Sequence, residues 1–376
     1  MTSMTRRERL TAIFEHRTPD RPAVKLWRAG RDDRLLHPDY APVRDAAREL
    51  TDLMVDFGAP FDLYCGRHRD RHVSVHEEPT DSPVWVDVVR TVQTPEGMLR
   101  SVFTRSTQNQ PGYEKVYLLK DPDDIRKLLS LPYDPFEFDP ETYRAADRRV
   151  GDAGIVLFGL DHAMYGLQRL VGSENFAMWS FEAEPIMLEA MATFAERIRD
   201  HARAILDSGL RPIFGWVGPE LAIPPLMSVE HFRRYVFEID QPLVDLLHHA
   251  GSRVWVHCHG RMSPVIELFA DMGVDVLNPV EPPPMGDVTL DEAFAMVEDR
   301  MALEGNIETH DLMTAGESAI KSKIDACLAA ATGDRRLILC PSSGYMEDPA
   351  PPPHLIENLL TYIHHGVARA EQSART

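Results

Sequence analysis

The pattern with the most evident chemistry is His257-Cys258-His259, which ends a short apolar run. Side chains at positions i and i+2 of a strand point to the same face, so the two imidazoles can converge on one ion. Cys340 ends a later apolar run and is a candidate third ligand. Two imidazoles and a thiolate suit zinc and leave a fourth position for water or substrate. The alternative is that the histidines hydrogen-bond substrate or carboxylates and that Cys340 is a small buried apolar residue.

Three carboxylates, Glu220, Glu281 and Glu304, end or follow other apolar runs. On three different strands they would supply a general acid, a general base or a contact to a substrate amine. Each one could instead orient a metal-binding histidine from behind. We therefore predict catalytic roles for these glutamates and keep the orienting role as the alternative.

Other polar residues stand where apolar runs end, and we predict that they bind substrate. Arg28 and Arg31 offer guanidinium groups that match a carboxylate, with surface salt bridges as the alternative. The remaining predicted substrate-binding residues are Asp161, His162, Asn278 and Asn306.

All these residues follow short apolar runs that alternate with segments of helical periodicity. A repeated order of strand, helix and strand indicates a parallel sheet, because parallel strands need crossover connections. Eight runs favour a closed (β/α)8 barrel of the α/β class over an open doubly wound sheet, and the site of such a barrel lies at the C-terminal ends of its strands. The predicted strands are 24–27, 61–64, 155–158, 212–216, 254–257, 274–277, 301–304 and 337–340, and the helices predicted in the second half are 228–249, 262–271, 290–298 and 315–331.

The interval from Cys65 to Gly154 is too long for one crossover helix. Within it, residues 84–92 and 98–104 alternate like strands around Thr94-Pro95-Glu96-Gly97, which is typical of a hairpin. We therefore predict a small antiparallel excursion between the second and third barrel strands. The whole chain, 1–376, is predicted to be one barrel domain with an insertion at about 66–154.

Composition excludes several classes of function. A formal net charge of −19 without a basic cluster argues against nucleic-acid binding. Four scattered cysteines do not make a disulfide framework, which favours a reducing compartment. Because no stretch reaches 18 apolar residues and the start lacks an apolar signal segment, we expect a cytoplasmic protein that does not enter a membrane.

The order of several segments resembles the uroporphyrinogen decarboxylase superfamily over nearly the whole chain. The matching segments are Arg6-Arg7-Glu8-Arg9-Leu10 with Pro19-Asp20-Arg21-Pro22, His257-Cys258-His259-Gly260, Gly273-Val274-Asp275-Val276-Leu277-Asn278-Pro279 and Leu303-Glu304-Gly305-Asn306-Ile307. The resemblance implies the same barrel and one of two activities. One branch holds cofactor-free porphyrinogen decarboxylases, and the other holds zinc-dependent methyltransferases that pass a methyl group from a corrinoid protein to a thiol such as coenzyme M.

The chain departs from both branches. Trp27-Arg28-Ala29-Gly30-Arg31 keeps only the Ala-Gly-Arg end of the decarboxylase segment Arg-Gln-Ala-Gly-Arg, and Asp62 is a weak counterpart of the decarboxylase aspartate. His259 stands at the second ligand position of the methyltransferases, and Ser343 stands where their last cysteine aligns. Cys340, three residues earlier, is the predicted substitute.

The leading interpretation is a zinc-assisted methyl transfer to or from a thiol or similar nucleophile, with His257, His259 and Cys340 as ligands and one of the three glutamates handling the proton. It implies a small-molecule substrate and a corrinoid partner protein, and the family suggests a homodimer. The first alternative is a decarboxylase that holds carboxylates with Arg28 and Arg31. A non-catalytic barrel that binds a small molecule is the second alternative.

Overall fold

The protein folds as the predicted α/β barrel. The computed structural model describes residues 3–30, 32–108, 110–344, 346–347 and 349–373. Eight strands form one parallel sheet in the order β1-β12-β11-β10-β9-β8-β7-β2. They are β1 (Ala23–Val24), β2 (Leu53–Phe57), β7 (Gly154–Gly159), β8 (Ile213–Val217), β9 (Arg253–His257), β10 (Val276–Asn278), β11 (Ala302–Ile307) and β12 (Leu337–Pro341).

The second barrel strand is the one strand position that the sequence pattern placed wrongly. It lies at Leu53–Phe57 and not at 61–64. The true strand carries the charged Asp56, so it does not read as an apolar run. The predicted segment is a turn because the Asp62 carboxylate accepts hydrogen bonds from the backbone N–H groups of Tyr64 and Cys65, at 3.0 and 2.7 Å. Such local side-chain bonds compete with a strand ladder.

The two ends of the sheet meet through Asp52, which immediately precedes β2. The Asp52 N–H donates to the Val24 carbonyl at 2.7 Å, and the Val24 N–H donates to the Asp52 carboxylate at 2.8 Å. This carboxylate is fully buried and pairs with Arg9 at 2.5 Å and with Arg21 at 3.2 Å. Arg9 also pairs with Asp20 at 2.7 Å. The basic and acidic residues near the N-terminus therefore join the first and last strands of the sheet.

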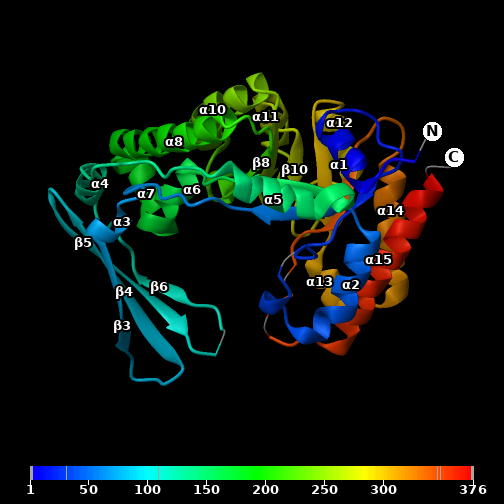
Figure 1. Ribbon diagram of the computed structural model, residues 1–376, viewed down its shortest axis with the longest axis horizontal. Helices are drawn as coiled ribbons and strands as arrows, with labels where there is room; N and C mark the ends of the chain where they lie inside the picture. Colours follow the sequence, from blue (N-terminus) through cyan, green and yellow to red (C-terminus); the bar gives the residue numbers. More distant parts are fainter. Residues whose placement is uncertain (1–2, 31, 109, 345, 348, 374–376) are drawn as a thin grey trace.

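Helices surround the sheet, and both termini lie on the same side of the molecule (Figure 1). Helix α1 closes the N-terminal end of the barrel, where Leu10, Ile13 and Phe14 pack with inward residues of the strands. The helices are α1 (Arg6–Phe14), α2 (Ala41–Leu50), α3 (Arg69–His72), α4 (Pro122–Leu129), α5 (Pro140–Val150), α6 (Ala163–Val171), α7 (Ser173–Glu182), α8 (Glu184–Asp207), α9 (Val229–Phe232), α10 (Glu238–His249), α11 (Ile266–Met272), α12 (Leu290–Val297), α13 (Thr309–Thr314), α14 (Glu317–Ala330) and α15 (Pro353–Ser373).

The four helices predicted in the second half are present, with shifted bounds. The segment predicted as one helix at 228–249 is α9, a π-helical turn at Arg233–Phe237 and α10 in succession. Helix α12 begins at a capping box, in which the Thr289 hydroxyl accepts from the Glu292 N–H and the Glu292 carboxylate accepts from the Thr289 N–H. This pairing satisfies two backbone donors that the helix itself cannot.

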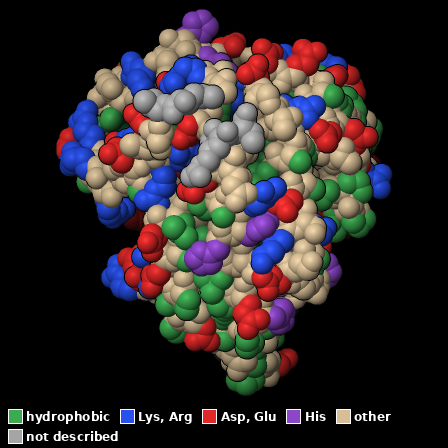
Figure 2. Space-filling model, turned by 90° about the vertical axis from the view of Figure 1, so that its right-hand side faces the viewer, with side chains coloured by type: hydrophobic (Ala, Val, Ile, Leu, Met, Phe, Trp, Pro, Cys, Tyr) green, Lys and Arg blue, Asp and Glu red, His purple; other side chains and the backbone are tan. Residues whose placement is uncertain are grey.

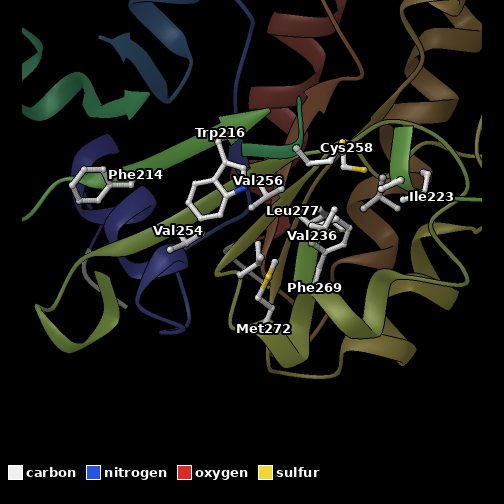
Figure 3. Close-up of a cluster of buried hydrophobic side chains, with 14 of the residues drawn as sticks. Phe214, Trp216, Ile223, Val236, Val254, Val256, Cys258, Phe269, Met272 and Leu277 are labelled. Carbon is white, nitrogen blue, oxygen red and sulfur yellow. The ribbon is translucent and has the colours of Figure 1, made fainter. Parts of the chain in front are cut away.

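A dense apolar layer lies between the sheet and its outer helices. Figure 3 shows a part in which Val254 and Val256 of β9 lie near Val236, Phe269 and other apolar side chains. Cys258 belongs to this layer and is fully buried. Because side chains alternate along an extended segment, burial of Cys258 directs His257 and His259 to the opposite side.

The predicted antiparallel excursion is a four-stranded sheet, β3-β4-β5-β6, that projects from the barrel (Figure 1). Its strands are β3 (Val73–Pro79), β4 (Trp85–Thr94), β5 (Gly97–Ser106) and β6 (Tyr113–Val116). The β4–β5 hairpin turns between Thr94 and Gly97, as the sequence indicates.

The surface mixes charges of both signs. On the face shown in Figure 2, Lys and Arg side chains lie interspersed with Asp and Glu. Within the described residues, no helix combines the length and the apolar character that a membrane crossing requires.

The contacts of Asp52 with Val24, Arg9 and Arg21, here called the Asp52 junction, can be tested by their effect on stability. Replacement Asp52→Asn leaves the buried Arg9 and Arg21 without that charge partner, and loss of one partner of a buried pair costs about 3–5 kcal/mol. We expect the free energy of unfolding, measured by urea denaturation, to fall by about 3 kcal/mol.

The matched control is Asp147→Asn, which breaks the pair of Arg7 and Asp147 at the partly exposed surface. That pair should contribute less than about 1 kcal/mol. Equal small losses in both variants would show that the junction does not hold the sheet ends together.

Candidate functional site

Two histidines at the C-terminal end of β9 form the centre of the site. The rings of His257 and His259 lie with centroids 4.5 Å apart and planes at 86°. The His257 side chain is 14% exposed, whereas that of His259 is 36% exposed. The convergence predicted from their i and i+2 spacing is therefore present.

Carboxylates from two other loops approach these rings. His259 Nδ1 lies 3.0 Å from Glu281 Oε1, and the Gly260 N–H donates to the other Glu281 oxygen at 3.1 Å. Glu220 Oε1 lies 4.0 Å from His257 Nε2. Two of the three predicted catalytic glutamates thus face the histidine pair.

The two histidines have opposite electrostatic surroundings. Burial, reinforced by the positive charge of His259, lowers the pKa of His257 to about 4. Burial also disfavours the charged form of His259, but the Glu281 carboxylate outweighs it and raises the His259 pKa above its usual value. Burial alone would raise the pKa of Glu281. The hydrogen bond from His259 outweighs burial, so the Glu281 pKa is lowered.

Glu304, the third predicted catalytic glutamate, lies fully buried beneath the pair. Its Oε1 atom accepts hydrogen bonds from Lys25 Nζ at 2.6 Å and from Asn278 Nδ2 at 2.9 Å. Trp255 Nε1 donates to its Oε2 atom at 2.8 Å. Asn278 Oδ1 in turn lies 2.6 Å from His257 Nδ1. Glu304 is therefore linked to His257 through Asn278 and is itself shielded from substrate.

Two indole rings form walls beside His257. The Trp255 ring is stacked on His257 at 5.8 Å, and the Trp27 ring meets it edge-on at 5.9 Å. The Lys25 ammonium lies 3.8 Å from the Trp27 ring centroid, a favourable cation–π arrangement. These contacts hold the His257 ring between aromatic and charged neighbours.

Glu308 is a site residue that the sequence pattern missed. It follows β11 directly, is 9% exposed, and accepts a hydrogen bond from the Ser342 hydroxyl at 3.3 Å. Burial, together with the negative charge of Glu281, raises the Glu308 pKa to about 7. The strand was predicted to end at Glu304, but β11 continues to Ile307, so the residue at its true end was not considered.

Several predicted substrate-binding residues have hydrogen-bond or charge partners other than the histidine pair. Asn306 accepts a hydrogen bond from the Cys327 thiol of α14 at 3.1 Å. His162 is buried, with Nε2 2.9 Å from Asp240 of α10, and Asp161 beside it is exposed. Arg28 lies 3.6 Å from Glu347, and Arg31 is outside the described residues.

The structure does not group the three predicted zinc ligands, His257, His259 and Cys340, with one another. In the described part of the chain, no three His, Cys, Asp or Glu side chains are grouped so that they could hold one. Cys340 is fully buried, and burial raises the pKa of its thiol well above the usual value, with Lys25 and Glu304 as its charged neighbours. Ser343, aligned with the family cysteine, is hydrogen-bonded to Thr309.

The fold and site define an α/β-barrel protein with a cluster of ionisable groups at the C-terminal rim, the usual position of a barrel active site. The sequence profile described as "Uroporphyrinogen decarboxylase (URO-D)" matches residues 163–365, more than half of the chain. The chain therefore belongs to the uroporphyrinogen decarboxylase family, which confirms the resemblance noted from its motifs. The matched part begins at α6 and includes both histidines.

A solved structure has the same fold. A methyltransferase from Methanosarcina mazei has a TM-score of 0.61 at 16% sequence identity, and the match covers 97% of this chain and 98% of that one. A xylose isomerase-like TIM barrel protein from Mycobacterium smegmatis, in complex with magnesium, has a TM-score of only 0.30 at 12% identity, covering 73% and 93% of the two chains. That second likeness is too slight to add to the argument. No curated protein sequence matches the chain.

The position of Cys340 leads to a prediction about metal binding. Because the thiol is enclosed beside Lys25 and Glu304, we expect Cys340→Ala to leave the zinc content of the purified protein unchanged, measured by elemental analysis. A His257→Ala, His259→Ala double variant shows whether any bound zinc depends on the imidazoles. About one zinc per chain in the wild type and none in Cys340→Ala would contradict this placement of the thiol.

Proposed function

We propose that this protein is an enzyme that transfers a methyl group from a small-molecule or carrier-bound donor to a nucleophile such as a thiol. The observation that carries the proposal is the contact between a histidine that stays neutral and one that tends to be protonated. A single site can contain both a base and an acid when its surroundings push the pKa values of two neighbouring groups apart.

In this proposal His257 removes the proton of the acceptor. A thiol loses its proton to the neutral imidazole, and the resulting thiolate attacks the methyl carbon. The new carbon–sulfur bond forms as the bond to the donor breaks, and the bonding electron pair stays with the donor. The His259 imidazolium, held by Glu281, stabilises the anionic acceptor before attack.

Family membership and the fold support an enzyme of this superfamily that acts on a small molecule. The choice of transfer over decarboxylation rests on the histidine pair. The decarboxylase alternative assigns carboxylate binding to Arg28 and Arg31; Arg28 lies 3.6 Å from Glu347, and Arg31 is outside the described residues. Zinc, a corrinoid partner protein and a homodimer remain predictions of the sequence, and no step above depends on them.

A variant series tests this assignment. With methylcobalamin as donor and 2-mercaptoethanesulfonate as acceptor, we expect His257→Ala and His259→Ala each to lose at least about 100-fold in kcat, the usual contribution of a positioned acid or base. The control is His249→Ala, which removes an exposed histidine at the far end of α10. Wild-type protein that transfers no methyl group to any of a panel of small thiols would contradict the proposal.

The two pKa directions predict the pH dependence of kcat/KM. Activity should appear as the pH rises through about 4, where His257 loses its proton. It should fall again above the raised pKa of His259, where the imidazolium loses its charge. Glu281→Gln removes the carboxylate that favours the charged form, so the alkaline limb should move to lower pH. An alkaline limb that does not move would show that His259 is not the group titrating there.

A further inference from the structure

A chain of hydrogen bonds runs from Lys25 and Trp255 through Glu304 and Asn278 to His257. The residue types determine which group donates and which accepts in each bond. Lys25 and Trp255 can only donate hydrogen bonds, and both donate to Glu304. Glu304 pairs with the Lys25 ammonium as a hydrogen-bond acceptor, and the Asn278 amide that meets the same Oε1 atom must also donate to it. Asn278 therefore presents its NH2 to Glu304 at 2.9 Å.

The orientation of Asn278 then determines the proton on His257. With its NH2 directed at Glu304, Asn278 presents its carbonyl oxygen to His257 Nδ1 at 2.6 Å. An amide oxygen only accepts, so Nδ1 must carry the hydrogen. In a neutral imidazole the other nitrogen, Nε2, then holds a lone pair. Nε2 is the nitrogen that lies 4.0 Å from Glu220 at the mouth of the barrel.

We propose that Lys25, Glu304 and Asn278 are positioning residues that fix the tautomer of His257, so that its Nε2 lone pair faces the substrate. The inference rests on the proposed function only in assigning that lone pair to catalysis. The tautomer itself is a property of the free protein.

The same geometry separates the two histidines. His257 meets a neutral amide, whereas His259 meets the Glu281 carboxylate. A carboxylate favours the doubly protonated imidazolium, and an amide oxygen favours one neutral tautomer. Lys25 compensates the Glu304 charge at 2.6 Å, so the chain beneath His257 ends in a neutral ion pair. Two histidines separated by a single residue therefore meet different partners, a neutral amide and a carboxylate.

A charge-neutral double variant should reverse the tautomer. In Lys25→Met, Glu304→Gln, the new amide must present its oxygen to the donor-only Trp255, which leaves its NH2 for Asn278. Asn278 would then turn its carbonyl toward residue 304 and its NH2 toward His257. Nδ1 must become the acceptor, and the proton of the neutral ring moves to Nε2. The variant leaves no unpaired buried charge, so it has a better chance of folding than either single change.

The experiment is a two-bond proton–nitrogen correlation spectrum of 15N-histidine-labelled full-length protein at neutral pH, in which His257 is assigned by its loss in His257→Gln. The wild type should show a pyridine-type nitrogen at Nε2, and the double variant should show it at Nδ1. Trp255→Phe is the matched control, because it removes the donor to Glu304 Oε2 but leaves the Asn278 bond to Oε1 in place. Its tautomer should stay that of the wild type.

Each outcome decides the inference independently of activity. A wild-type proton on Nε2, or the same tautomer in the wild type and a folded double variant, would overturn it. If the double variant does not fold, Asn278→Ala serves instead, since a free histidine side chain prefers its proton on Nε2 and should revert to it. Loss of methyl transfer with an unchanged tautomer, by contrast, would count against the proposed function and not against this chain of hydrogen bonds.

Discussion

The organisation of the rim depends on one buried ion pair, that of Lys25 and Glu304, at 2.6 Å. Both side chains are almost fully enclosed. An uncompensated charge at this depth would cost several kcal/mol, so the carboxylate must meet strong donors on both oxygens. Trp255 and Asn278 complete that requirement. The position of His257 follows, because the amide that serves Glu304 also serves its ring.

Along β9, side chains alternate between the apolar layer under the helices and the interior or mouth of the barrel. In β9 and the residues after it, Val254, Val256 and Cys258 enter the layer beneath the helices, whereas Trp255, His257 and His259 face inward or toward the mouth. Lower in the barrel, the interior is apolar and is closed by α1. The polar groups of the site thus lie at the C-terminal end, whereas the Asp52 junction and the apolar floor lie at the N-terminal end.

The sequence predicts the barrel well because its signals are local. Apolar runs and their periodicity locate seven of the strands, and the i and i+2 spacing brings His257 and His259 together. The second strand was missed because Asp56 interrupts its apolar pattern, and Asp62 makes a turn of the segment that resembled a strand. A pattern of residue types does not contain such local hydrogen bonds.

The rest of the site depends on contacts between strands far apart in the sequence. Lys25 and Trp255 lie inside apolar runs and read as ordinary strand residues, yet both donate to Glu304. Cys340 was predicted as a ligand from its position at a strand end, but its thiol is enclosed beside the ion pair. Asn306 contacts the Cys327 thiol of α14, although regular alternation along β11 would place its side chain on the same face as that of Glu304. These contacts depend on how the strands align with one another, which the pattern of residue types does not show.

The most direct test of the account is a double-mutant cycle on the free energy of unfolding, with Lys25→Met and Glu304→Gln made singly and together. Each single change leaves a buried group without its partner, and we expect losses of about 3–5 kcal/mol. Because the double variant removes both charges, it should be at least as stable as either single variant, with a coupling energy of at least about 2 kcal/mol. Losses that add within about 0.5 kcal/mol would contradict the claim that the ion pair organises the rim.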